Sequence, residues 1–317
     1  LKDKIGTPSV VICLDSGCQN YDQLWMTTSL RGVFMANLTV QLLTEGIHSG
    51  DSGLIRDSFH ILRLILDRID DANTGEMLKE LYVEIPESHI NYAKECAACL
   101  GDTVYTQIPF FNDECSPQIS ECKTNKDKLY ELVLNRTWRP QLSITGIDGM
   151  PDLKGGNVLR KYTTIKLSVR IPPSMDPEKA QIALKKACEA KPTPFGANVE
   201  CKISSHCGAG FVCPEFEPWL TKSMQSASSK YFGKPAQFTG EGGSIPFMGL
   251  LQKKFPNAQF VITGILGPNS NAHGPNEFLH IDFTKKVMCC VANILYDIGQ
   301  RDLNQNKMEI DQSKDDK

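Results

Sequence analysis

The chain has 317 residues, which is enough for two domains or for one large domain carrying an insertion. Its formal charge of −3 is small and spread along the chain, so nothing in the composition points to nucleic acid or an anionic membrane as a partner. No apolar run approaches the ~20 residues of a membrane span.

The sequence contains twelve scattered cysteines, several of which lie inside apolar stretches. Cys96 and Cys99 are separated by two residues but lack a matching second pair, which argues against a structural zinc knuckle. The chain is also far larger than a disulfide-stapled module. We therefore expect buried free thiols in a reducing compartment and a cytoplasmic protein.

The first half of the chain contains two predicted strands and one clear helix. Residues 8–14 (PSVVICL) form a short β-branched run, typical of a buried strand, that ends at Asp15. Residues 31–43 alternate as a longer strand, and residues 57–69 have apolar positions at helical spacing, with Asp57 as the N-cap. The following sixty residues are mixed and partly helical.

The middle of the chain continues with strands and a helix. Residues 142–147, 163–171 and 199–203 alternate as strands. Residues 176–190 form a helix with Pro177 in its first turn. Together with the preceding elements, this order predicts an α+β unit in which helices cover one sheet.

The last third changes character to α/β. Residues 217–232 and 284–299 are predicted helices, and residues 258–266 an apolar strand. The middle unit therefore looks inserted into a domain whose two parts lie on either side of it. The tail from residue 301 is polar, without apolar periodicity, and is predicted to be disordered.

Four positions stand out as candidates for chemistry in loops or at strand ends. Asp15 could bind a metal ion at the carboxyl end of its strand, or simply cap a turn. His273 lies in a Gly/Pro/Asn-rich loop, which raises the question whether it is a ligand or a catalyst. His48 has glycines on both sides that allow a ligand close approach, but isolated loop histidines more often have no catalytic role. His206 is equally ambiguous and has a weaker local signal.

An anion site is predicted around the segment TGEGGSIP. Gly243 and Ser244 would expose backbone N–H groups toward a carboxylate, while Glu241 could bind a metal ion or a substrate ammonium group. The same segment could be an ordinary turn with Ser244 as an N-cap. Arg170, within a strand, suits bidentate carboxylate recognition if it faces a cleft, and is otherwise a surface arginine.

The order of these motifs resembles the M20 family of metallopeptidases, in its branch of non-specific dipeptidases, carnosinases and Cys-Gly dipeptidases. The motifs that carry the resemblance are CLDSG, SLRG, GIHSG, WRPQLSITGIDG, GGNVLRKYTTIKLSVRIPP, EGGSIP and NAHGPNE. The resemblance implies an α/β zinc-peptidase-like catalytic domain (partial) interrupted by an inserted α+β lid/dimerisation domain. The implied boundaries are 1–30 and 208–302 for the catalytic domain, 31–207 for the lid, and 303–317 for the disordered tail.

The resemblance also implies roles for the ionisable candidates. Asp15 matches a ligand of one metal ion and His273 a ligand of the other. His48 matches a catalytic histidine that reaches into the partner subunit and helps stabilise the oxyanion. Glu241 is expected to face the substrate amino group.

Substrate-binding roles follow in the same way. Arg170, Gly243 and Ser244 match the pocket for the C-terminal carboxylate of the substrate, with His206 nearby. Asn157 occupies the position of a threonine that contacts substrate in the dipeptidase branch, so its role is open.

The implied activity is hydrolysis of dipeptides or short peptides by a homodimer that holds two divalent metal ions, Zn²⁺ or Mn²⁺. The family's remaining ligands and its general base precede the segment matching residues 4–15, so we expect the chain to be a fragment that lacks them. Two alternatives stay open, namely an N-acyl amino acid deacylase of the same family and a non-catalytic dimerising or binding protein.

Overall fold

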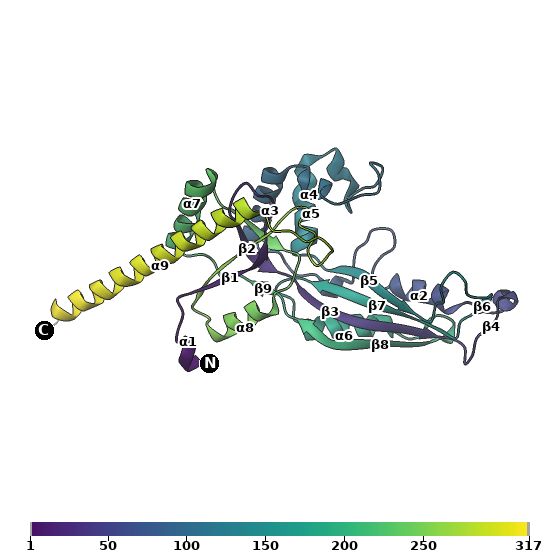
Figure 1. Cartoon of the computed structure of the whole chain (residues 1–317). Coiled ribbons are helices and arrows are strands. Elements are labelled where there is room, and N and C mark those ends of the chain that lie inside the picture. The colour runs from purple at the N-terminus through teal and green to yellow at the C-terminus, as the bar shows by residue number, and fades with distance from the viewer. Residues whose placement is uncertain (1, 316–317) are drawn as a thin grey trace.

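The computed structural model describes the backbone of residues 2–315 as two lobes, one of them an elongated sheet (Figure 1). The strands are β1 Val10–Gly17, β2 Trp25–Leu30, β3 Gly32–Gln41, β4 Ile47–His48, β5 Gln141–Asp148, β6 Val158–Leu159, β7 Tyr162–Ile171, β8 Asn198–Gly208, β9 Phe211–Val212, β10 Gln237–Glu241 and β11 Gln259–Leu266. The α-helices are α1 Lys2–Ile5, α2 Ser58–Leu66, α3 Glu87–Leu100, α4 Thr103–Thr106, α5 Leu129–Thr137, α6 Pro177–Cys188, α7 Pro218–Phe232, α8 Pro246–Lys254 and α9 Ile281–Asp315.

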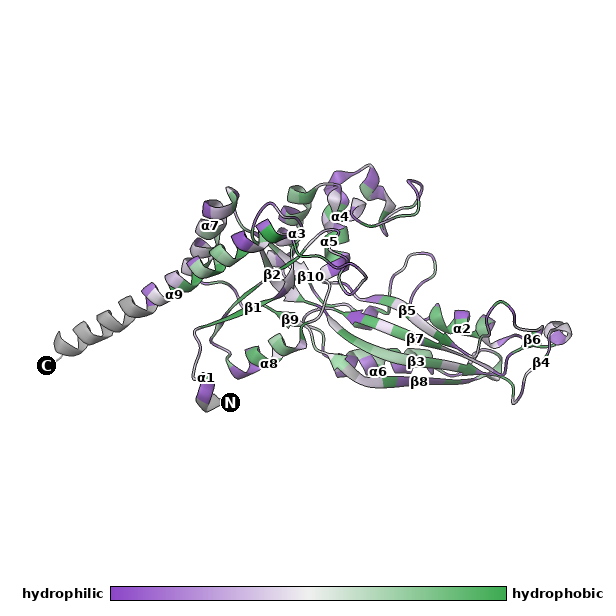
Figure 2. Cartoon of the chain, viewed as in Figure 1, coloured by the Kyte–Doolittle hydropathy of each residue, from purple (hydrophilic) through white to green (hydrophobic). Residues whose placement is uncertain are grey.

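The elongated lobe is an antiparallel sheet of four strands in the order β5-β7-β3-β8. Alternate residues of β3 are buried because successive side chains of a strand point to opposite faces. That buried face packs against α2 and α6 in one apolar core, and hydrophobic residues run along these strands in Figure 2. Asp57 and Asp176 cap the two helices by accepting backbone N–H groups. The predicted α+β unit is therefore present.

The second lobe contains parallel strand pairs. β1 pairs with β11 and β10 with β2, and β2 also lies beside β11. The core on one side includes residues of α3, α5, α7 and α9, and the core on the other side includes residues of α8. The sequence did not predict β2 or β10, although every residue of β2 is buried.

The expectation that β1 is a buried strand is wrong. Among the described residues β1 pairs only with β11, so it is an edge strand, and the Leu14 side chain is 56% exposed. Asp15 is exposed as well. The apolar run alone could not distinguish an edge strand from a central one, since both can be rich in β-branched residues.

Helices α3 and α5 follow strands β3 and β4 in sequence, but they pack with the second lobe. Both contact β10, and their apolar residues share a core with Trp25 and Phe238. The chain therefore leaves the sheet of the lid after α2 and returns to it at β5. The domain boundaries near residues 30, 207 and 302 stay predictions.

The last helix differs from the expected disordered tail. α9 runs without a break to Asp315 and projects away from the second lobe (Figure 1). Residues 300–315 contain neither glycine nor proline, so nothing in them ends a helix that begins on a packed face. Residues 316–317 lie outside the described part. No helix among the described residues has an apolar stretch long enough to cross a bilayer.

A buried histidine in α3 predicts pH-dependent stability. His89 is 7% exposed and its ring lies 4.6 Å from that of Trp138. Burial lowers its pKa from 6.5 to about 4. Because the fold disfavours the protonated form, the contribution of His89 to stability is complete above its unfolded pKa and is lost as the pH falls from 6.5 toward 4.

As the pH falls from about 7 to about 4, the free energy of unfolding should decrease more in the wild-type protein than in the variant His89→Gln. The difference should be on the order of 3 kcal/mol, since one pKa unit corresponds to about 1.4 kcal/mol. Urea unfolding at a series of pH values measures it. Equal pH slopes for the two proteins would contradict the buried, neutral histidine.

Gly264 in β11 lets β1 come unusually close. A Cβ at this position would lie 1.5 Å from the carbonyl oxygen of Ser16, at a register shift between the two strands. We expect Gly264→Ala to destabilise the protein by about 1–3 kcal/mol, because a backbone must move. Gly299→Ala is the matched control. It meets no atom within 4 Å in α9 and should stabilise by about 0.5–1 kcal/mol. Similar urea midpoints for both variants would refute this account.

Candidate active site

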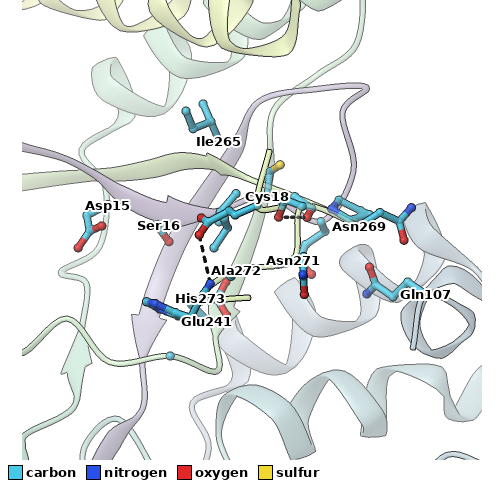
Figure 3. Close-up of a pocket in the computed structure, with 18 of the residues that line it drawn as sticks. Asp15, Ser16, Cys18, Gln107, Glu241, Ile265, Asn269, Asn271, Ala272 and His273 are labelled. Carbon is cyan, nitrogen blue, oxygen red and sulfur yellow. Dashed lines mark hydrogen bonds between the residues drawn. The ribbon is translucent and has the colours of Figure 1, made fainter. Parts of the chain in front are cut away.

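A cavity of about 1080 Å³ lies where β1, β10 and β11 meet the loop of residues 267–280. It is lined by predicted site residues from distant parts of the sequence, as Figure 3 shows for Asp15, Glu241 and His273. Gly243 and Ser244 line the same cavity. The structure therefore brings five of the predicted site residues to one cavity, namely Asp15, Glu241, Gly243, Ser244 and His273.

Asp15 reaches the cavity through an irregularity in β1. The register between β1 and β11 shifts on both sides of Ser16. The Ser16 hydroxyl lies 2.6 Å from that of Thr27 in β2, which fixes the bulged strand to its neighbour. A bulge re-aims the side chains beside it, and here it leaves the carboxylate of Asp15 exposed on the cavity wall.

The loop that carries His273 has an unusual backbone. His273 has a φ of 59°, in the left-handed region that few residues other than glycine and asparagine adopt. Three asparagines of the same loop, at positions 269, 271 and 276, share this conformation. The backbone N–H of His273 donates to the carboxylate of Glu277 at 3.2 Å. Such strain persists only where surrounding contacts fix it, and it concentrates at functional sites.

The turn after β10, where the sequence predicts an anion site, has two hydrogen bonds that involve charged side chains. Glu241 accepts the N–H of Gly242 at 2.8 Å, and Arg170 donates to the Ser244 hydroxyl at 3.0 Å. A Cβ on Gly242 would lie 3.1 Å from the Cγ and the carbonyl oxygen of Arg136 and 3.2 Å from an Nη of Arg31, so the turn passes tightly between these two arginines. Arg170 is thus not an isolated surface arginine but a partner of this turn.

Arg31 fixes the turn by a side-chain hydrogen bond to its backbone. It is 8% exposed and donates to the carbonyl oxygens of Gly242, Asn135 and Arg139 at 3.2–3.3 Å. Burial lowers the pKa of Arg31 to about 9, and the positive charges of Arg170 and Arg136 act in the same direction. Burial also lowers the pKa of Arg170, while Glu241 opposes that effect. The site therefore concentrates positive charge around one carboxylate.

Arg170, His48 and Asn157 are not among the residues that line the cavity. Arg170 contacts the turn beside the cavity through the Ser244 hydroxyl. His48 and Asn157 lie together at the β4–β6 tip, the end of the long sheet farthest from β1 and β10 (Figure 1), where Ser49 N–H donates to the Asn157 carbonyl at 3.0 Å. Both side chains are exposed. His206 lies in β8, but its side chain is outside the described part of the structure.

The described residues do not complete a metal site. Asp15 and His273 are chemically suitable donors in one cavity, since carboxylates and imidazoles both bind Zn²⁺. Catalytic zinc sites, however, have about three protein ligands. No group of three or more His, Cys, Asp or Glu able to hold an ion occurs within residues the structure describes. The two donors present are therefore too few to fit the implied ions.

Sequence reasoning missed three residues that line the cavity. Arg136 comes from the end of α5, Gln107 follows α4, and Gln19 follows β1. An Nη of Arg136 donates to the Gln19 side chain at 2.5 Å. No local pattern marks these positions, because the packing of α3–α5 against the second lobe places two of them there.

Comparison with known proteins agrees with this geometry. The family model described as the peptidase dimerisation domain of M20 proteins matches residues 28–194. Cysteinylglycine-S-conjugate dipeptidase of Corynebacterium striatum is 25% identical over 93% of this chain and 61% of its own length. Cys-Gly metallodipeptidase DUG1 of Saccharomyces cerevisiae is 26% identical over 81% of this chain and 52% of its own length. The chain thus spans little more than half of these relatives.

Solved structures show the same fold. Human carnosine dipeptidase 1 superposes with a TM-score of 0.69 at 16% identity, covering 92% of this chain and 59% of that protein. The dipeptidase Dug1p of Saccharomyces cerevisiae superposes with a TM-score of 0.66 at 24% identity, covering 91% and 59%. Since the dimerisation-domain match alone spans more than half of the sequence, the chain belongs to the M20 peptidase family.

Proposed function

We propose that this chain forms the substrate-binding wall of a hydrolase that cleaves dipeptides or short peptides. The observation that carries the proposal is the contact between Arg170 and Ser244 on the turn that also presents Glu241 to the cavity. The carboxylate of Glu241 and the hydroxyl that binds Arg170 then lie three residues apart on one turn.

The turn suits a substrate whose two charged ends lie close together. Arg170, the Ser244 hydroxyl and the N–H of Gly243 would bind the C-terminal carboxylate, since guanidinium and hydroxyl donors form strong bonds to an anion. Glu241 would accept the substrate amino group. A longer peptide could not place both ends on the same turn, so this arrangement favours dipeptides over longer chains.

Asp15 and His273 support the assignment to metal-dependent hydrolysis. Each would supply one ligand to the pair of Zn²⁺ or Mn²⁺ ions that the family implies. Because the described residues contain no group of three or more His, Cys, Asp or Glu placed to hold an ion, the proposal requires further ligands in addition to Asp15 and His273. The substrate contacts of Arg170, Ser244 and Glu241 do not depend on those ligands.

His48 and Asn157 would act in the partner subunit. They lie at the far tip of the sheet of the lid, inside the segment that matches the dimerisation domain. In a homodimer that tip would enter the cavity of the second copy. His48 would there donate to the developing oxyanion, which is often the largest single contribution to catalysis in acyl transfer. Asn157 would contact the substrate beside it, and His206 would lie near the substrate carboxylate.

Two other functions have specific observations behind them. A deacylase would bind N-acyl amino acids, but these lack the free amino group that Glu241 is placed to accept. A non-catalytic dimerising protein would agree with the absence of a three-donor metal group among the described residues. Dipeptide hydrolysis agrees best with the charges of the turn.

The first prediction compares Arg170→Met with Arg63→Met, a control on an exposed position of α2. In the presence of Zn²⁺ or Mn²⁺, Arg170→Met should lower kcat/KM for the dipeptide Ala-Ala by roughly 10–100-fold, because it removes a charged hydrogen bond. Arg63→Met should match wild type. Cleavage of N-acetylalanine in preference to Ala-Ala would favour the deacylase. Failure of Ala-Ala to bind or react, with the dimer intact, would favour the binding protein.

The second prediction tests whether His48 acts across subunits. His48→Ala should lower turnover by on the order of 10²–10³-fold with the dimer intact. Mixing His48→Ala subunits with Arg170→Met subunits, followed by exchange, should restore activity to roughly a quarter of wild type. Half of the dimers are then mixed, and each mixed dimer has one site with both side chains. Mixing gives no recovery if His48 serves its own subunit.

A further inference from the structure

Arg136 is a charged cavity residue to which the proposed function gives no role. It lies on α5, and its Cγ and carbonyl oxygen flank Gly242 of the substrate-binding turn. It is the only arginine or lysine among the described residues that line the cavity. The proposed function assigns the substrate ends to Glu241 and to Arg170 with Ser244, so Arg136 is free to contact a substrate side chain in the cavity that it lines.

The three arginines around the turn carry more positive charge than the neighbouring carboxylates balance. Neither Arg31, Arg136 nor Arg170 makes an ion pair with any described residue, and Glu241 is the carboxylate that acts on Arg31 and Arg170. Partly buried cations without a counter-ion are unfavourable. A dipeptide with a neutral side chain would bring one carboxylate to this cluster and leave it positive.

Arg136 is the member of the cluster that remains available to a ligand. The donors of Arg31 are engaged by three backbone carbonyls, and Arg170 is engaged by Ser244. Arg136 donates one Nη to Gln19, and its buried Nε has no hydrogen-bond partner among the described residues. A buried donor without a partner costs free energy that a ligand acceptor would recover.

The surroundings of Arg136 favour an anion. Its fixed partner Gln19 is a neutral amide that is 7% exposed, and Gln107 is a second amide on the cavity wall. The nearby carboxylate of Glu277 accepts from His273 and Glu241 accepts from Gly242. The planar fork of a guanidinium matches a carboxylate in a way that a neutral group cannot.

We infer that Arg136 is a specificity-determining residue that binds an acidic side chain, so that the preferred substrates are dipeptides containing Asp or Glu. The inference rests on the proposed dipeptide site and names its substrate class. It assigns Arg136 no part in bond cleavage.

The test measures calorimetric binding of two matched pairs, Ala-Glu with Ala-Gln and Glu-Ala with Gln-Ala, to the purified chain. Wild type should bind the acidic member of at least one pair tenfold or more tightly. Arg136→Gln should abolish that ratio and leave the Kd of the amide dipeptides within about twofold, while Arg136→Lys should retain part of it. Lys128→Gln, an exposed position just before α5, is the charge-matched control and should keep the wild-type ratio.

The outcomes separate this inference from the proposed function. Equal wild-type affinity for acidic and amide dipeptides would overturn the role of Arg136 while leaving a dipeptide site. Equal loss of all four ligands in Arg136→Gln, with an unchanged thermal transition by circular dichroism, would show that Arg136 only shapes the turn and would overturn it too. Failure of all four dipeptides to bind wild type would reject the dipeptide site itself, and the inference with it.

Discussion

A buried guanidinium joins the parts of this protein that form its cavity. Arg31, between β2 and β3, donates to the carbonyls of Gly242, Asn135 and Arg139 and so connects the sheet junction, the turn after β10 and the end of α5. Its own carbonyl accepts the hydroxyl of Ser244. Carbonyl groups at the end of a helix lack intrahelical partners, and a buried cation needs acceptors for its N–H groups. The hydrogen bonds between them meet both needs, so the contact is favourable despite burial. Because one side chain fixes three segments, the anion-binding turn is positioned before any ligand arrives.

The consequence is a cavity whose wall includes a helix from the dimerisation-domain match. α5 supplies Arg136 and the second lobe supplies Asp15 and the turn, while Arg170 of β7 contacts the turn through Ser244 without lining the cavity. The excursion of α3–α5 from the lid onto β10 is what allows a segment within the dimerisation-domain match to form part of this wall. The tip that carries His48 does not contribute to this cavity, because the length of the sheet separates the two within one chain. One lid therefore contributes a wall at one end and a projecting tip at the other.

The metal donors illustrate how far geometry alone supports the chemistry. Asp15 depends on a bulge at Ser16 and on the missing side chain of Gly264, while His273 depends on a loop with four left-handed residues. Both features hold a side chain at a position that regular structure would not reach. They place two possible metal ligands at one cavity. The described residues contain no group of three or more His, Cys, Asp or Glu that could hold an ion. The turn after β10, in contrast, is held by hydrogen bonds from Arg31 and Arg170.

The sequence by itself determined the features that arise from local periodicity and local chemistry. Alternation in β3 and β7, the cap Asp57, Pro177 in the first turn of α6, and the turn beginning at Glu241 were all predictable, since each depends on residues a few positions apart. Only the tertiary structure decided that β1 is an edge strand, that β2 and β10 lie in the second lobe, and that Arg136 enters the cavity. These outcomes depend on contacts such as that of Arg31 with Gly242, which are 211 residues apart. Burial and charge balance are properties of the assembled surface, and no short stretch of sequence encodes them.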